Sequence, residues 1–214
     1  MKALIFDLDG VIVDTAEFHY RAWKKVGAKF GLKLTRAQNE QLKGISRKDS
    51  LIKVLRWAET VVNDTDFEQI MDEKNKHFLA LVNELTPRNT LPGVREFIDD
   101  ARQSGYATAI GSASKNAHTI LNKLELVDAF DEIVDGNSVK TTKPDPGVFT
   151  RAADLLGVEY GQCVVFEDSE AGIVAAKSAG MVAVGIGSSP YLSIAEWVFP
   201  GFENLSVEFV NQLK

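Results

Sequence analysis

Near its start the chain reads Leu4-Ile5-Phe6-Asp7-Leu8-Asp9-Gly10-Val11, a short apolar run that leads directly into two carboxylates and a glycine. Asp is a poor strand former, so two of them at the end of a strand indicate a functional turn. Side chains at i and i+2 of an extended chain point the same way, although a curl at Gly10 could separate them. Two such carboxylates can attack an electrophile, bind a divalent ion or transfer a proton.

An isolated Asp-x-Asp is more often a solvated turn after an edge strand. Here the preceding run is too apolar for an edge strand, and polar residues follow several other strand-like runs along the chain. These two features favour a buried, central strand whose turn carries chemistry.

Composition limits the class of protein and its partners. The chain has 214 residues, 45% hydrophobic and 25% charged, which suits a globular protein of one domain or of one domain with a sizeable insertion. Its net charge of −6 and the lack of a long basic run argue against a nucleic-acid partner. The single cysteine, Cys163, lies in an apolar run and is expected to be buried and unreactive. No apolar stretch reaches membrane-spanning length, so we expect a cytoplasmic protein without membrane association, by default a monomer.

Most of the chain alternates strand-like and helix-like patterns. Strands are predicted at 3–6, 107–110, 133–134, 163–166 and 182–186, and helices at 94–104, 115–124, 147–156 and 170–179. Gly105, Gly157 and Gly180 follow three of these helices as C-terminal caps. Apolar strands separated by helices predict an α/β fold with a doubly wound parallel sheet, which binds ligands beyond the carboxyl ends of its strands.

The segment 14–86 interrupts this alternation. Phe18, Ala22, Val26 and Phe30 form a helical stripe, further helices are predicted at 46–60 and 66–84, and no strand is evident. We therefore predict a core domain of residues 1–13 and 87–214, with an all-helical cap domain of residues 14–86 inserted after the first strand, above the two carboxylates.

Four motifs in order resemble the haloacid-dehalogenase superfamily of phosphotransferases. They are Asp7-Leu8-Asp9-Gly10-Val11, Ser112 after the second strand, the pair Lys143-Pro144, and Glu167-Asp168 followed by Ser169-Glu170-Ala171-Gly172. The resemblance implies a Rossmann-like core, Asp7 as the nucleophile that forms an aspartyl-phosphate, and a Mg²⁺ cofactor. It places Mg²⁺ on Asp7, the backbone carbonyl of Asp9 and Asp168, with Glu167 nearby. It also implies that Lys143 neutralises charge, while Ser112 and the amides around Ala113 bind phosphoryl oxygens.

Three of these motifs also have simpler interpretations. Lys143 could be a solvated turn lysine, Ser112 could cap the helix that begins near Lys115, and Glu167-Asp168 could cap the helix that follows them. The functional interpretation is favoured because all of these residues fall at strand ends of one sheet.

The residue at the position of Asp9 distinguishes the subclasses of this superfamily. Dehalogenases lack an acid at this position because halide leaves unprotonated, so Asp9 indicates phosphoryl transfer to or from an alcohol oxygen. Stretches in the cap and after the second strand are similar to those of the superfamily's sugar phosphomutases. They include Thr15-Ala16-Glu17-Phe18-His19, Leu42-Lys43-Gly44-Ile45-Ser46-Arg47 and Ser112-Ala113-Ser114-Lys115-Asn116.

This narrower resemblance implies roles for the cap. Arg47, in the first helical turn after the cap residue Ser46, would bind the sugar's second phosphate. Ser114, Lys115 and Asn116 would assist it from the core. Lys43, next to Gly44, would contact the sugar and hold the cap closed. Thr15 would lie at the hinge and steady Asp9, and His19 would partner either Asp9 or the residues that link the cap to the core. Lys43 and Arg47 could equally be solvated, His19 could be a packed helix residue, and Trp23 is expected in a core.

The implied reaction converts β-D-glucose 1-phosphate to glucose 6-phosphate through the phospho-enzyme and a bound glucose 1,6-bisphosphate. One alternative is a sugar-phosphate phosphatase with the same catalytic residues. A catalytically silent binding protein would be expected to lack Asp7, Asp9, Lys143 or Asp168. Phosphonate cleavage through a Schiff base on Lys43 would leave Arg47 without a role.

Overall fold

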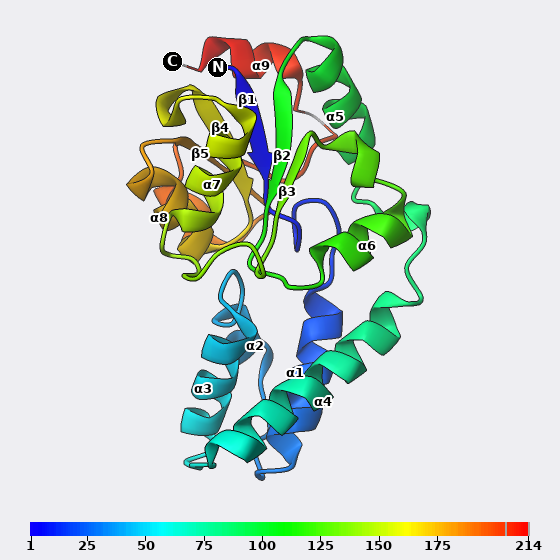
Figure 1. Cartoon of the computed structure of the whole chain (residues 1–214), viewed down its shortest axis with the longest axis vertical. Coiled ribbons are helices and arrows are strands. Elements are labelled where there is room, and N and C mark those ends of the chain that lie inside the picture. The colour runs from blue at the N-terminus through cyan, green and yellow to red at the C-terminus, as the bar shows by residue number, and fades with distance from the viewer. Residues whose placement is uncertain (204, 214) are drawn as a thin grey trace.

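One parallel sheet organises the computed structural model, which describes residues 1–203 and 205–213. Within these residues the sheet has six strands in the order β3-β2-β1-β4-β5-β6 (Figure 1). Their bounds are β1 Ala3–Phe6, β2 Ala107–Gly111, β3 Glu132–Val134, β4 Cys163–Glu167, β5 Val182–Ile186 and β6 Trp197–Phe199. This order is that of the doubly wound Rossmann fold, so the predicted fold class is confirmed.

β1 occupies the centre of the sheet and is fully buried on both faces. Leu4 and Phe6 pack on one face with α5 (Val94–Gln103), α6 (Ala117–Leu124) and α9 (Val207–Gln212). Ala3 and Ile5 pack on the other face with α7 (Gly147–Leu156) and α8 (Glu170–Ser178). The apolar character of this strand therefore reflects a central position, as predicted.

Glycines end three core helices as expected. Gly105, Gly157 and Gly180 have φ of 84°, 67° and 73°, the left-handed conformation that glycine adopts without steric cost. Short 3₁₀ segments complete the core; they are η1 Pro87–Asn89, η2 Val127–Ala129, η3 Tyr160–Gln162 and η4 Pro190–Ile194.

The helical segment after β1 lies beyond the carboxyl ends of the strands, at the far end of the molecule from both termini (Figure 1). It comprises α1 Ala16–Ala28, α2 Arg36–Glu40, α3 Arg47–Trp57 and α4 Asp64–Val82, and residues 14–86 contain no strand. The segment has an apolar cluster of its own, which includes Trp23, Leu51 and Val54. Two α4 residues, Phe78 and Val82, instead join the cluster of the sheet.

Three short elements differ from the prediction, and α3, α4 and α6 begin one or two residues away from their predicted starts. α2, β6 and α9 were not predicted, because they have only five, three and six residues and because Trp197 and Val198 of β6 are not buried. α6 begins at Ala117 with Asn116 as its N-cap, so Ser112 does not cap it. Cys163 is buried as predicted, and burial raises the pKa of its thiol to about 11. Among the described helices, none has the length and apolar character needed to span a membrane.

Candidate active site

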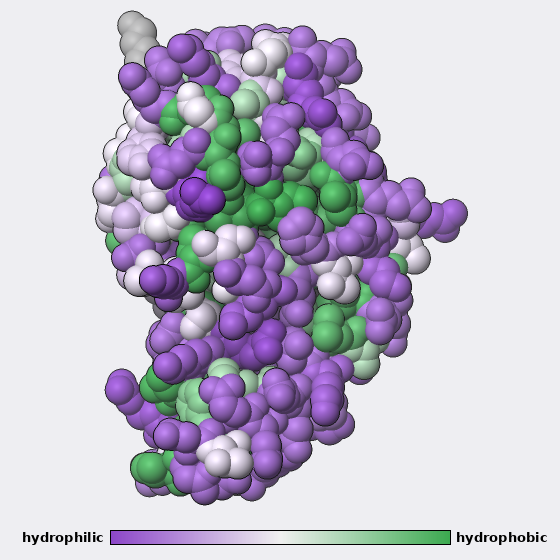
Figure 2. Space-filling view, in the orientation of Figure 1, coloured by the Kyte–Doolittle hydropathy of each residue, from purple (hydrophilic) through white to green (hydrophobic). Residues whose placement is uncertain are grey.

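A cavity of about 460 Å³ lies between the helical segment and the carboxyl ends of the strands. Figure 2 shows that the surface at the waist between these two lobes is mainly hydrophilic. The size is typical of a small-molecule site. Most of the predicted site residues line the cavity: Asp7, Asp9, Thr15, His19, Lys43, Gly44, Ser46, Arg47, Ser112, Ala113, Ser114, Lys115, Asn116 and Asp168.

Lys143 lies beneath the floor of this cavity and is only 1% exposed. Its Nζ donates to Asp7 Oδ1 at 2.6 Å and to Glu167 Oε1 at 2.6 Å. The ammonium group also lies 4.6 Å from the centre of the Phe149 ring. This environment excludes the solvated turn lysine that the Lys-Pro dipeptide alone would allow. Lys143 is a buried cation that joins the ends of β1 and β4.

The ionisation of this cluster reflects a balance between burial and charge. Burial opposes charge on Lys143, but the carboxylates of Asp7 and Glu167 outweigh it and hold its pKa above the ordinary value. Burial raises the pKa of Asp7, and the negative charges of Glu167, Asp9 and Asp168 raise it further. The positive charge of the Lys143 ammonium group lowers it. The Lys143 ammonium is thus shared by two buried carboxylates, and among the described residues Asp168 has Lys43 as its only ion-pair partner, so the three carboxylates exceed the two ammonium groups that pair with them.

Both carboxylate oxygens of Glu167 have partners. Oε1 accepts from Lys143, and Oε2 accepts from the backbone N–H of Ser169 at 2.7 Å and from its hydroxyl at 2.8 Å. Ser169 is itself the N-cap of α8, accepting from the Gly172 N–H, so the capping role belongs to Ser169 and not to the acidic pair. A Cβ at Gly172 would lie 1.9 Å from Glu167 Oε1. The start of α8 therefore fixes Glu167 in place.

The carboxylates of Asp7, Glu167 and Asp168 each offer an oxygen within 4.8 Å of the others. Burial, reinforced by Glu167, raises the pKa of Asp168 to about 7. Clustered carboxylate oxygens with unbalanced negative charge suit a hard divalent cation such as Mg²⁺. The donor set therefore fits the predicted metal. The Asp9 carboxylate is not part of this group, so only its backbone carbonyl remains available for the predicted contact.

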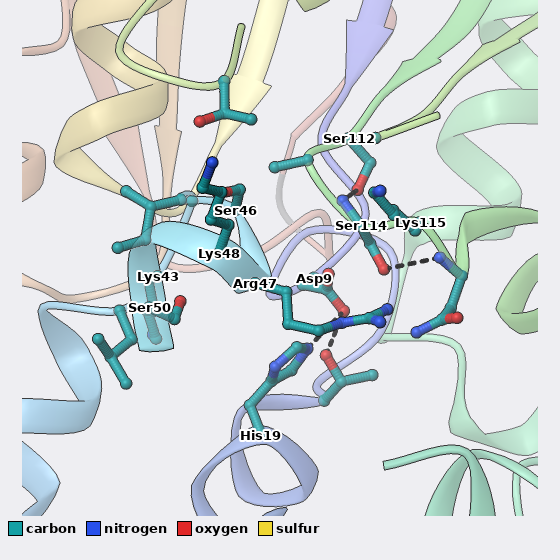
Figure 3. A pocket seen from close by; sticks show the side chains of 18 of the residues that line it. Asp9, His19, Lys43, Ser46, Arg47, Lys48, Ser50, Ser112, Ser114 and Lys115 are labelled. Atoms are coloured by element: carbon teal, nitrogen blue, oxygen red, sulfur yellow. Dashed lines mark hydrogen bonds and ion pairs between the residues drawn. The ribbon is translucent and has the colours of Figure 1, made fainter. Parts of the chain in front are cut away.

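Asp9 is held on the side of the cavity where the helical segment begins. The Thr15 hydroxyl donates to Asp9 Oδ1, and His19 Nε2 lies 4.0 Å from the same oxygen. Figure 3 shows Asp9 and His19 facing each other across these contacts. Burial raises the pKa of Asp9, while the Thr15 hydrogen bond and the charge of Lys74 lower it. A buried carboxyl group with a raised pKa is suited to transferring a proton.

Lys74 of α4 is a cavity residue that the sequence analysis missed. It is 3% exposed, and its Nζ lies 2.9 Å from His19 Nδ1. Burial lowers its pKa to about 7. The signal in the sequence was the stripe Ile70, Lys74, Phe78 and Val82, in which a lysine takes a position that the helix buries.

A second set of cavity residues lies at the N-terminus of α3. Ser46 is the N-cap, accepting from the Asp49 N–H, and Arg47 is the first residue of the helix. In Figure 3 the Arg47 side chain extends across the cavity toward Ser114 and Lys115 of the core. A helix N-terminus with an arginine is suited to binding an anion. This set is separate from the Asp7 cluster.

Contacts join the helical segment to the core around the cavity. Lys43 Nζ lies 3.1 Å from Asp168 Oδ2 and 3.2 Å from Glu40 Oε2. Burial opposes charge on Lys43, but these two carboxylates raise its pKa. Elsewhere on the rim, Asn116 Nδ2 donates to Asn75 Oδ1 at 2.9 Å and Thr142 Oγ1 donates to Asp49 Oδ2 at 3.1 Å. Lys43 is therefore an ion-paired residue rather than a solvated one.

Comparison with known proteins is consistent with this geometry. The haloacid dehalogenase-like hydrolase family matches residues 4–186. A β-phosphoglucomutase of Bacillus subtilis is 40% identical over 99% of this chain and 95% of its own length. A phosphorylated carbohydrates phosphatase of Thermotoga maritima is 31% identical over 85% of this chain and 82% of its own. The crystal structure of a Clostridium difficile β-phosphoglucomutase superposes with a TM-score of 0.95 at 37% identity, covering 99% of this chain and 96% of that one. A parallel sheet with acidic residues at its strand ends, a helical insertion and these relatives place the chain in the haloacid dehalogenase-like hydrolase family.

Proposed function

We propose that the protein is a β-phosphoglucomutase that interconverts β-D-glucose 1-phosphate and glucose 6-phosphate. The observation that carries the proposal is that one cavity brings together two separate sets of residues, each of which has groups suited to meeting a phosphate. Asp7, Lys143 and Ser112 form one set, and Arg47 with the N-terminus of α3 forms the other. A sugar bisphosphate has a phosphate for each set, whereas a simple phosphatase needs only one. The similarity to the Bacillus enzyme supports the same conclusion.

In the proposed reaction Asp7 is the nucleophile and becomes an aspartyl-phosphate. Lys143 reduces the repulsion between this carboxylate and the incoming phosphoryl group, and Ser112 donates to a phosphoryl oxygen. Mg²⁺ held by Asp7, Asp168 and the Asp9 carbonyl would supply further positive charge at the transferring group. Glu167 keeps Lys143 and the start of α8 in place.

Asp9 is the proposed general acid and base. Phospho-Asp7 donates its phosphoryl group to a sugar hydroxyl while Asp9 accepts the hydroxyl proton, which gives the bound 1,6-bisphosphate. After the sugar reorients, its other phosphate meets Asp7. Asp9 then protonates the departing oxygen, and phospho-Asp7 is regenerated. Thr15 and His19 orient Asp9 throughout.

Reorientation requires a cap that opens and then closes to exclude water. We propose that residues 14–86 form this cap and that residues 1–13 and 87–214 form the core. The contacts of Lys43 with Asp168 and of Asn75 with Asn116 support a role in the closed state. When closure is incomplete, water competes for phospho-Asp7.

A sugar-phosphate phosphatase of the same superfamily is the second candidate, favoured by the similarity to the Thermotoga phosphatase. The test supplies Mg²⁺, β-D-glucose 1-phosphate and a trace of glucose 1,6-bisphosphate, and follows glucose 6-phosphate and free phosphate together. The proposal predicts rapid isomerisation with little phosphate release. Stoichiometric release of phosphate with no glucose 6-phosphate would establish the phosphatase instead. The α-anomer serves as the matched substrate control.

A further inference from the structure

The loop 112–116 that follows β2 lines the cavity but is held by few bonds of its own. Ser114 N–H donates to Ser112 Oγ at 3.1 Å, and Asn116 N–H donates to Ser114 Oγ at 3.2 Å. The side chain of Asn116, the N-cap of α6, makes no capping hydrogen bond. In the described residues, the N–H groups of Ala113 and Lys115 donate to no acceptor. The loop therefore has two free amides beside the cavity and needs support from outside.

That support comes from the turn that follows the neighbouring strand β3. The carboxylate of Asp135, a buried residue, accepts from the Asn137 N–H at 2.9 Å, the Asn137 side-chain amide at 2.9 Å and the Ser138 hydroxyl at 3.0 Å. These bonds hold the turn in one conformation. The turn then donates to the loop twice, from Gly136 N–H to the Ser114 carbonyl at 3.1 Å and from Asn137 Nδ2 to the Lys115 carbonyl at 3.2 Å.

These two bonds fix the orientation of the loop's peptide groups. In a trans peptide the C=O of one residue and the N–H of the next point in opposite directions. Holding the Ser114 carbonyl against Gly136 therefore turns the Lys115 N–H away from the turn. If this peptide rotated, its carbonyl oxygen would take the place of the donor, and an oxygen repels a phosphate.

Gly136 is required here by the distance between the two backbones. Its φ is not in the left-handed region, so another residue could adopt its conformation. A Cβ at this position, however, would lie 2.4 Å from the Ala113 carbonyl oxygen and 3.1 Å from its carbonyl carbon. Because backbone atoms cannot move aside as a flexible side chain can, any side chain at residue 136 must displace the loop.

We propose that Gly136 and Asn137 are positioning residues, which hold the loop 112–116 so that the amides of Ala113 and Lys115 bind a phosphoryl group. The inference rests on the proposed function, since it assigns these amides to a phosphate of the substrate. It extends the site to a turn that contributes no charged side chain to the cavity.

The test uses inorganic phosphate with Mg²⁺ as the probe, so that it does not depend on the identity of the sugar. In a ¹⁵N-labelled sample, phosphate should shift the amide resonances of Ala113 and Lys115. Gly136→Ala should weaken phosphate binding tenfold or more and abolish the Lys115 response, and Asn137→Ala should weaken binding by a smaller factor. Gly161→Ala is the matched control, because its Cβ would meet nothing within 4 Å. A melting temperature measured for each variant separates loss of binding from loss of folding.

Two results would overturn the inference. One is wild-type phosphate affinity and an unchanged Lys115 response in Gly136→Ala. The other is no amide response at Ala113 or Lys115 when phosphate saturates the wild-type protein. A protein that gives the predicted phosphate response but does not isomerise β-D-glucose 1-phosphate would instead contradict the proposed function alone.

Discussion

Lys74 Nζ lies 2.9 Å from His19 Nδ1, so two basic side chains meet inside the cap, next to the proposed general acid. Burial lowers the pKa of Lys74 to about 7, with Arg47 adding to the effect. Burial, Lys74 and Arg47 together hold the pKa of His19 well below its ordinary value. A neutral His19 can accept a hydrogen bond from Lys74 at Nδ1 and donate one toward Asp9 from Nε2. The pair therefore links a cap helix to Asp9.

Lys74→Met should raise the pKa of Asp9. The Lys74 charge is one of the influences that lower this pKa, so its removal leaves burial less opposed. Since Asp9 must be ionised to accept a proton from the sugar hydroxyl, the acidic limb of the kcat/KM profile should move to higher pH. Lys76→Met, an exposed lysine two residues along the same helix, is the control and should leave the profile in place. Superimposable profiles for Lys74→Met and wild type would contradict the assignment.

The same variant should change how stability depends on pH. Lys74 has a pKa of about 7 in the folded protein and an ordinary value of 10.5, so between these limits the unfolded chain binds more protons. The free energy of unfolding of the wild type should therefore rise with pH across that window, on the order of a few kcal/mol in total. Lys74→Met should lack this contribution. Denaturant unfolding at pH 7, 8.5 and 10 gives the free energy of unfolding at each pH. The same increase with pH in the two proteins would be inconsistent with a buried, titrating Lys74.

Gly44→Ala should impair cap closure. Gly44 has φ of 72°, and a Cβ there would lie 2.4 Å from the Ser169 hydroxyl, which Glu167 holds in place. Gly31→Ala is a matched control, with φ of 74° and nothing within 4 Å of the added Cβ. Both changes place an L-residue in the left-handed conformation and carry a similar backbone cost, about 1–2 kcal/mol. Only Gly44→Ala should lower isomerisation, by tenfold or more, and raise the phosphate released per turnover. Equal activities of the two variants would contradict the closed-cap account.

Arg47→Ala should weaken isomerisation much more than simple phosphate-ester hydrolysis. Hydrogen bonds to charged groups contribute about 1.5–3 kcal/mol each, so kcat/KM for β-D-glucose 1-phosphate should fall by roughly 10–100-fold. Hydrolysis of p-nitrophenyl phosphate, which lacks a second phosphate, should change little. Arg56→Ala, in the last turn of the same helix, tests for a general effect on α3. Equal losses with both substrates would show that Arg47 does not act on a second phosphate.

The sequence predicted those features of the sheet and of the site that a local pattern of residues determines. The apolar run before Asp7 predicted a central strand, and Ser46 with Asp49 predicted the start of α3 and the place of Arg47. Lys143 could only be identified through a family resemblance, because its burial depends on Glu167, which is distant in sequence. Contacts of this kind arise from tertiary packing and leave no local pattern.

Other features became apparent only in three dimensions. The burial of Lys74 was implied by its helical stripe, but its contact with His19 depends on how α1 and α4 pack. Gly136 resembles an ordinary turn glycine in the sequence, and its requirement appears only when β2 and β3 bring their loops together. The short edge strand β6 has too few buried residues to produce a pattern.

The most direct test of the account is to identify the residue that becomes phosphorylated. The protein is mixed with Mg²⁺ and ³²P-labelled glucose 1,6-bisphosphate, quenched with acid, and the labelled peptide is mapped. We predict an acid-stable, base-labile acyl-phosphate on Asp7 in the wild type, with no label in Asp7→Asn. Label on Ser112 or His19, or equal labelling of Asp7→Asn, would contradict the central claim.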